Sequence, residues 1–173
     1  MTDIWSKEKR SEVMSRIRGQ DTRPERVVRS MLHRMGYRFT VKGPGNRGLP
    51  GKPDMVMPKH RCVVYVHGCF WHGHGGCKGF RLPLSNVGFW SAKIAGNKAR
   101  DRRSLRAVRA LGWKALVVWE CETRTLVALG KLRQRLAREL GGQAAKAGGG
   151  ANPALPLAAD AVAVYQVGKR RMR

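Results

Sequence analysis

The stretch from Val66 to Phe80, VHGCFWHGHGGCKGF, gathers residues that bind metals and carry protons. Three of the chain's five histidines and two of its four cysteines lie within it. Cys69, His74 and Cys77 are close enough in sequence for soft sulfur and nitrogen atoms to converge on one ion, as in tetrahedral zinc sites. The many glycines leave this loop little apolar side chain with which to order itself. A structural zinc ion therefore explains the cysteines better than a role as small core residues.

A closed zinc site needs a fourth ligand, and two more cysteines are available. Cys121 ends a strand-like run that a crossover would place beside the run ending at His67. Cys62 is the poorer candidate, because alternation along a strand points its side chain away from that of His67 and into the core. The sequence predicts Cys121 as the fourth ligand.

Asp54 stands where a Gly/Pro loop enters an apolar strand. A carboxylate in that position must be paired, hydrogen-bonded or bound to a cation, and Mg²⁺ prefers such oxygen ligands. Pro-Asp at a strand start is typical of nucleases that also carry Glu-x-Lys on the next strand, but here that strand ends in YVH. His67 and His72 could replace the missing lysine as proton carriers, or could themselves be zinc ligands.

Phe70 and Trp71 lie between these histidines, where metal ligands on either side turn inward. Their rings are therefore expected to remain exposed. On a basic surface such rings can stack on bases or open a base step, and mismatched steps cost less to open. Trp90 could join them from the neighbouring helix or could be a core anchor.

The elements that must position these residues indicate an α/β domain. Nearly continuous apolar runs over 54–57, 61–67 and 115–121 predict interior strands covered on both faces. A further strand is expected over 37–41, followed by a Gly/Pro loop over 42–53 that excludes regular structure. Helices are predicted over 6–19, 22–36, 89–112 and 123–140. In the second, Thr22 and Glu25 form a capping box. In the third, the apolar positions are Ile94, Leu105, Val108 and Leu111. Strand, helix and strand in sequence predict a right-handed parallel crossover.

The charge of the chain indicates its partner. Lys and Arg number 35 against 11 Asp and Glu, which gives a net charge of +24 and a pI near 11.4. Nucleic acid is therefore the expected ligand.

A membrane is not expected, since no basic helix has a clean apolar face and no apolar run nears the roughly 20 residues of a span. With no export signal, cysteine is expected to bind metal rather than form disulfides. The Ala/Gly-rich segment 141–173 is predicted to be a flexible tail.

Four segments, in order, resemble the very-short-patch repair endonucleases: LPGKPD, YVHGCFWHGHGGC, FWSAKIAGNKARDRR and LGWKALVVWEC. The resemblance runs from about Arg10 to Cys121, and more loosely to about Leu140. It implies a restriction-endonuclease-like core over 1–140, a mixed central sheet flanked by helices, with an added structural zinc site. It also implies a Mg²⁺-dependent nicking endonuclease acting beside T·G mismatches left by deamination of 5-methylcytosine. Such an enzyme would be a monomer associated with the nucleoid in the bacterial cytoplasm, with double-stranded DNA and mismatch-repair proteins as its partners.

The resemblance also assigns residues. Asp54 and the backbone carbonyl of Val66 would bind Mg²⁺. The catalytic residues with Asp54 would be His67, His72, Asp101 and Glu25. The zinc ligands would be Cys69, His74, Cys77 and Cys121. The intercalating residues would be Phe70, Trp71, Trp90 and Met14. The family pattern has His-x-Cys at the zinc, and HGGC contains one residue more.

Two other functions remain open at this stage. One is a restriction-fold nuclease with another DNA target, and the other a non-catalytic, zinc-stapled nucleic-acid-binding protein. The second needs neither Asp54 nor two non-ligand histidines, and the aromatic residues favour mismatch recognition over the first.

Overall fold

The computed structural model describes residues 12 and 19–141. Of the helix expected over 6–19, only Glu12 is described before Gly19, and it is helical. Met14 and the segment 142–173 lie outside the described residues.

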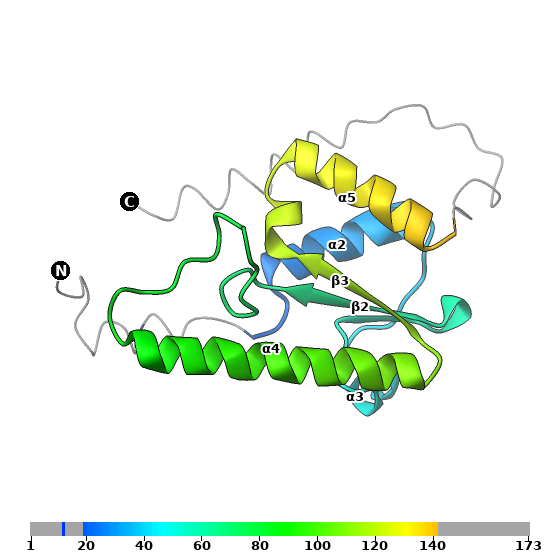
Figure 1. Cartoon of the computed structure of the whole chain (residues 1–173). Helices are drawn as coiled ribbons and strands as arrows, with labels where there is room; N and C mark the ends of the chain where they lie inside the picture. The colour runs from blue at the N-terminus through cyan, green and yellow to red at the C-terminus, as the bar shows by residue number, and fades with distance from the viewer. Residues whose placement is uncertain (1–11, 13–18, 142–173) are drawn as a thin grey trace.

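A three-stranded mixed sheet forms the centre of the molecule (Figure 1). Its strands are β1 (Met55–Met57), β2 (Cys62–His67) and β3 (Lys114–Trp119), in the order β1-β2-β3. β1 is antiparallel to β2, and β2 is parallel to β3. Helix α4 (Val87–Ala110) connects the two parallel strands, so the predicted strand–helix–strand unit is confirmed.

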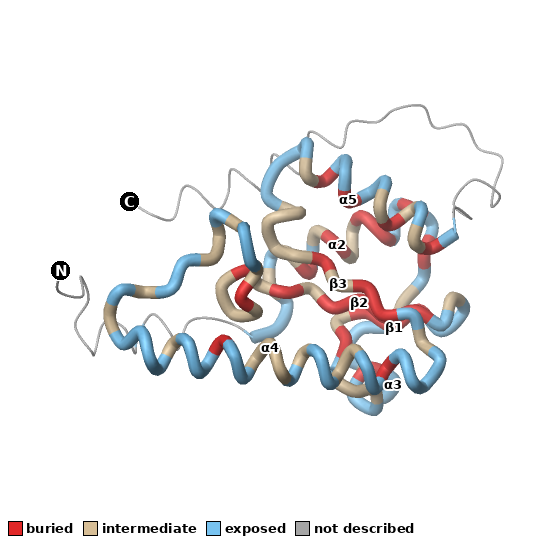
Figure 2. The backbone as a smooth tube through the Cα atoms, viewed as in Figure 1, coloured by how far each residue is buried: buried red, intermediate tan, exposed pale blue. Residues whose placement is uncertain are grey.

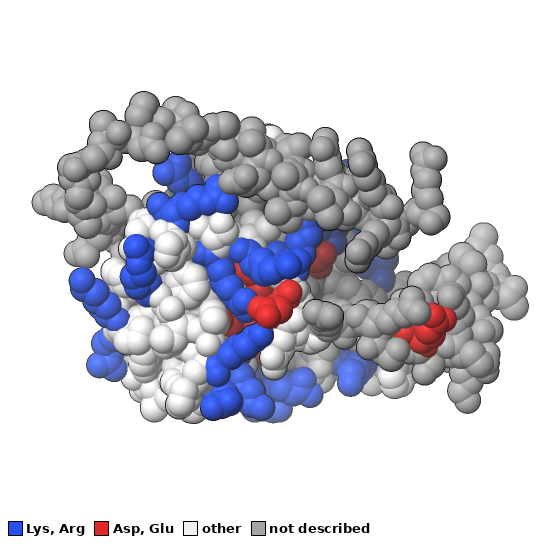
Figure 3. All heavy atoms as spheres, turned by 180° about the vertical axis from the view of Figure 1, so that it is seen from behind, with Lys and Arg blue, Asp and Glu red and all other residues white. Residues whose placement is uncertain are grey.

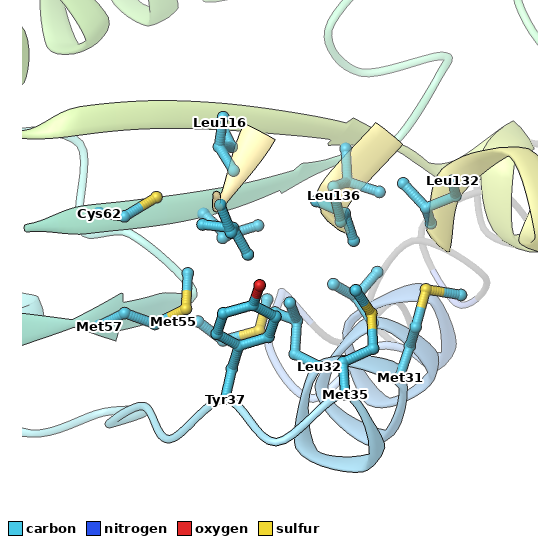
Figure 4. Close-up of a cluster of buried hydrophobic side chains, with 14 of the residues drawn as sticks. Met31, Leu32, Met35, Tyr37, Met55, Met57, Cys62, Leu116, Leu132 and Leu136 are labelled. Carbon is cyan, nitrogen blue, oxygen red and sulfur yellow. The ribbon is translucent and has the colours of Figure 1, made fainter. Parts of the chain in front are cut away.

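Helices cover both faces of this sheet, as the continuous apolar runs predicted. On one face α2 (Arg23–Arg34) and α5 (Leu126–Glu139) enclose the larger apolar core, and α4 packs on the other. Figure 2 shows the buried strands between helices whose outer surfaces are exposed. In Figure 4, Leu132 and Leu136 of α5 lie across this larger core from Leu32 of α2. Cys62 is fully buried in it, which confirms that its side chain points into the core.

Helix α2 begins as predicted. The Thr22 side chain accepts from the Glu25 backbone, and the Glu25 carboxylate accepts from the Thr22 N–H, which completes the capping box. The helix ends before Gly36, whose φ of +87° suits glycine.

Four expectations from the sequence were wrong in detail. Residues 37–41 form an isolated bridge, Thr40 to Val56, because Lys42 at φ +59° turns the chain away from β1. The Gly/Pro loop contains a short helix, α3 (Pro44–Gly48), because the buried Asn46 amide donates to the carbonyls of Thr40 and Pro53.

The other two concern element ends. Leu111 is 53% exposed, since α4 stops at Ala110 and Gly112 at φ +75° starts the turn into β3. β3 itself ends at Trp119, and the 3₁₀ helix η2 (Glu120–Thr123) carries Cys121. A second 3₁₀ helix, η1 (Pro58–His60), follows β1. None of the helices in the described part of the chain has the length and apolar character of a membrane span.

Candidate functional site

The site lies at the edge of the sheet where β2 and β3 end. Parallel strands end at the same edge, and the register pairs His67 with Trp119. β1 runs the other way, so Asp54, just before it, starts at this same edge and donates its N–H to the Val64 carbonyl at 3.0 Å. The sheet thus brings Asp54 and His67 to the same edge, where both line one cleft.

Asp54 is a largely buried carboxyl group with one strong partner. Its Oδ2 accepts the Val66 N–H at 2.7 Å. Burial raises the pKa of Asp54 to about 6; the Val66 hydrogen bond opposes this rise and the nearby Glu25 charge adds to it. A carboxylate that is costly to ionise in isolation gains from a neighbouring cation. Asp54 is therefore suited to holding a hard metal ion.

His67 and His72 form a stacked pair beside Asp54. Their ring centroids are 3.9 Å apart and their planes differ by 7°. The Nδ1 atom of His72 lies 2.6 Å from Oδ2 of Asp101, on α4. Burial, followed by the charge of His72, lowers the pKa of His67 to about 4, so His67 is neutral near pH 7.

His67, His72 and Asp101 each offer one potential ligand atom, and these three atoms lie within 4.8 Å of one another. The stacked rings nevertheless argue against a shared ion, because ring-nitrogen lone pairs lie in the ring planes and nearly parallel planes do not converge. The hydrogen bond to Asp101 instead fixes the tautomer of His72. The arrangement suits proton transfer better than metal binding.

The second group of site residues, the cysteine cluster, consists of Cys69, His74, Cys77 and Cys121. All four ligand atoms lie within 4.8 Å of one another. His74 Nδ1 is 3.6 Å from the Cys69 sulfur and 3.5 Å from the Cys121 sulfur. With zinc–sulfur and zinc–nitrogen bonds of about 2.3 and 2.05 Å, a tetrahedron places such atoms about 3.6 Å apart. The cluster therefore fits one tetrahedral ion.

The two histidines of the loop face different groups. His74 turns to the cysteines and His72 to Asp101, despite the additional glycine in HGGC. Burial, and then the neighbouring Cys69 and Cys77, raise the pKa of Cys121 to about 12. A cation held by the cluster would offset the cost of ionising Cys121.

The aromatic cluster consists of Phe70, Trp71 and Trp90. Phe70 meets both tryptophans edge to face, with centroids 5.2 Å away in each case, and the tryptophans are 6.1 Å apart. All three are only partly buried and belong to neither apolar core. Trp90 therefore joins the two loop residues rather than anchoring the core.

The cleft beside Asp54 has a volume of about 960 Å³. Its lining includes the proposed catalytic and metal-binding residues Glu25, Asp54, Val66, His67, His72 and Asp101, together with Trp71 of the aromatic cluster. One cavity therefore contains acids, histidines and an aromatic ring.

Comparison with known proteins identifies the family. A family model described as DNA mismatch endonuclease Vsr matches residues 2–78. A type II nicking enzyme of Xanthomonas oryzae pv. oryzae is 50% identical over 129 residues, which cover 75% of this chain and 92% of that protein. The DNA mismatch endonuclease Vsr of Escherichia coli K12 is 42% identical over 124 residues, 72% of this chain and 77% of that protein. The chain belongs to the Vsr family. It is therefore a DNA nicking endonuclease, and the resemblance drawn from its motifs is confirmed.

The charges of this Vsr-family protein suit DNA. Between Asp54 and Asp101 the sequence has seven Lys or Arg residues and no Asp or Glu. Figure 3 shows basic side chains around a small group of acidic ones on the face opposite to that of Figure 1. Basic side chains bind phosphates, while the acids can hold a metal ion.

Reasoning from the sequence missed three residues around the site. The Glu120 carboxylate accepts the Cys69 N–H at 3.2 Å and is paired with Arg124. Trp119 stacks on His74. Phe89 is 62% exposed and contacts Trp90. All three lie within the segments FWSAKIAGNKARDRR and LGWKALVVWEC, which carry the family resemblance, and their positions there were the available signal.

Proposed function

We propose that this Vsr-family endonuclease nicks one DNA strand beside T·G mismatches, using Mg²⁺ at Asp54 and a structural zinc ion in the cysteine cluster. The observation that carries the proposal is the meeting of Asp54, the stacked His67–His72 pair and an aromatic ring in one cleft. The mixed sheet between helices would be a restriction-endonuclease-like core. The substrate would be DNA with T·G mismatches left by deamination of 5-methylcytosine.

Asp54 and the Val66 carbonyl would hold the Mg²⁺ ion. When bound, the ion supplies positive charge at the scissile phosphate and acidifies water. The raised pKa of Asp54 supports this assignment, since a nearby cation stabilises the ionised form. Glu25 lines the same cleft and is proposed as an acid near the metal-bound waters, in addition to capping α2.

Proton transfer from the attacking water is assigned to His72, and a hydrogen bond to the phosphate is assigned to His67. The Nδ1 atom of His72 is hydrogen-bonded to Asp101, so Nε2 is left to take a proton from the attacking water. Asp101 would stabilise the imidazolium that results. His67, neutral because of its depressed pKa, can donate a ring N–H to a phosphate oxygen. Together, His67 and His72 would serve in place of the Glu-x-Lys lysine that the strand ending in YVH lacks.

Mismatch selection is assigned to the aromatic cluster, with Met14 as the fourth intercalating residue. Aromatic rings inserted between bases require unstacking, which costs less at a mismatch than at a paired step. The partial exposure of Phe70 and Trp71 supports this role. The proposed enzyme acts as a monomer on nucleoid DNA in the bacterial cytoplasm, with mismatch-repair proteins as further partners.

The test is nicking of an end-labelled duplex containing T·G, compared with the same duplex containing C·G, with and without Mg²⁺. We expect one cut beside T·G, dependent on Mg²⁺, and little cutting of C·G. Asp54→Ala should abolish nicking and leave duplex binding nearly unchanged, because phosphate contacts dominate affinity. Glu139→Ala is the control, because Glu139 ends α5 and pairs with Lys114 at the start of β3, and neither residue lines the cleft. Equal cutting of both duplexes would indicate a nuclease with another DNA target.

A further inference from the structure

The indole of Trp119 lies between the two groups of site residues. It stacks on the ring of His74, with centroids 4.0 Å apart and planes 2° from parallel. The ring of His67 stands nearly perpendicular to the indole, at 77°, with centroids 5.4 Å apart. We infer that Trp119 is a positioning residue that orients His67 for catalysis and His74 for metal binding, an inference that rests on the proposed function.

The backbone of Trp119 is held on two sides. Its β2 neighbour in the register is His67 itself, so the two side chains start from adjacent positions. Its N–H donates to the Glu122 carboxylate at 2.8 Å. Arg135 of α5 donates to that carboxylate at 3.0 Å and to the Val117 carbonyl at 3.2 Å. The end of β3 is therefore anchored to α5, and the indole starts from a fixed point.

His67 depends on ring contacts for its orientation. Its ring stacks on His72 and lies 6.2 Å from the ring of Tyr65 and 5.4 Å from Trp119. His72 is fixed by its hydrogen bond to Asp101. Without the indole, the His67 ring would lose one of its three aromatic neighbours and could rotate about its side-chain bonds. Small misplacements of a catalytic group cost much of its effect.

His74 is oriented by the same side chain. Its Nδ1 atom faces the sulfurs of Cys69 and Cys121, while the ring lies flat against the indole. Groups behind a metal ligand hold its ring in the direction of the ion and thereby raise affinity. Trp119 is part of neither apolar core, so filling a core does not account for its position.

Three variants test this role. Trp119→Leu keeps apolar volume and removes the ring, Trp119→Phe keeps a ring, and Trp113→Leu is the control. Trp113 stands just before β3, packed against the α4-side core and away from the histidines. For each, one would measure Tm, kcat and KM for nicking the T·G duplex, and the rate of zinc release to a chelator.

We expect Trp119→Leu to lose about tenfold to a hundredfold in kcat with KM unchanged, and to release zinc about tenfold or more faster. Trp119→Phe should recover most of both quantities. Trp113→Leu should lower Tm while leaving kcat and zinc release as in the wild type. Wild-type kcat and zinc release in Trp119→Leu would overturn the inference. Equal effects of Trp119→Leu and Trp113→Leu would also overturn it, because they would show general loosening.

The outcomes separate this inference from the proposed function. If the wild type cuts T·G and C·G equally, mismatch specificity fails, and the Trp119 comparison is read on either duplex. If the wild type contains no zinc, the proposed zinc site fails and kcat alone decides for or against Trp119.

Discussion

Replacing Asp54 by asparagine should stabilise the Mg²⁺-free protein at pH 8 while abolishing nicking. An aspartate in the unfolded chain has its ordinary pKa of 3.8, and burial raises the pKa of folded Asp54 to about 6. Ionisation above pH 6 therefore costs the native state about 3 kcal/mol, because one pKa unit is worth about 1.4 kcal/mol. Asparagine avoids this cost and keeps an oxygen that can accept the Val66 N–H.

The sign of the pH dependence follows from the same values. Well below pH 3.8 Asp54 is protonated in both states and contributes nothing through its charge. As pH rises toward 6, the unfolded chain ionises first, and the native state loses stability relative to it. Asp54→Asn should thus gain about 2.5 kcal/mol over the wild type between pH 4 and pH 8, roughly 5 to 10 °C in Tm.

The assay is denaturant or thermal unfolding of both proteins at several pH values, first without Mg²⁺ and then with it. Mg²⁺ should stabilise only the wild type, by about 2.7 kcal/mol at a hundred times its dissociation constant. Comparing proteins at each pH removes the contribution of His67, which is lost in both as pH falls from 6.5 through its pKa of about 4.

Asp21→Asn is the control with the opposite sign. Hydrogen bonds from Lys42 and Arg29 lower the pKa of Asp21 to about 2, so its carboxylate stabilises the fold above pH 3.8. This variant should be less stable than the wild type at pH 8, and the difference should vanish as pH falls toward 2. A stability difference for Asp54→Asn that is the same at pH 4 and pH 8, or that favours the wild type at pH 8, would refute the reasoning.

Other perturbations address the remaining parts of the site. Chelating zinc, or Cys121→Ser, should lower Tm and loosen the fold as seen by circular dichroism; folded, zinc-free wild type would remove the assignment of the cysteine cluster. Phe70→Ala or Trp71→Ala should weaken binding to the T·G duplex roughly ten- to hundredfold, since stacking is worth about 1–3 kcal/mol per base, and leave C·G binding nearly unchanged. Equal losses on both duplexes would make them packing residues. Asp101→Asn should lower kcat by at least about a hundredfold at constant KM, because a neutral amide cannot stabilise the His72 imidazolium; single-turnover nicking measures this, and unchanged kcat would contradict it.

Local rules in the sequence predicted a large part of this fold. The capping box at Thr22 and Glu25 involves residues three apart, so its geometry follows from the helix itself. The parallel pairing of β2 with β3 follows from strand, helix and strand in order. That pairing is also what made Cys121 a candidate ligand, and the structure places its sulfur beside His74.

Residue patterns could not predict contacts that depend on how a loop lies against a helix. His72 and Asp101 are 29 residues apart, and no periodicity relates a glycine-rich loop to a turn of α4. Only the family resemblance pointed to Asp101. The exposure of Leu111 has a similar cause, because the helical pattern continues past Ala110 whereas the backbone turns at Gly112. Single hydrogen-bonding side chains, such as Asn46, produced the short helix that composition argued against.

The absence of a second strand carboxylate and lysine changes what the fold must supply. A lysine on a strand is positioned by the sheet, whereas His72 sits on a loop rich in glycine and has no regular backbone to hold it. Three attachments hold this loop in place of a strand, namely the cysteine cluster, the 2.8 Å hydrogen bond from Asn97 to the Trp71 carbonyl, and the His72–Asp101 contact. Two of these come from α4, which runs below the sheet in Figure 1. If His67 and His72 carry the protons as proposed, catalysis depends on a long helix and on the cysteine cluster that support this loop. The aromatic rings on the loop depend on the same supports.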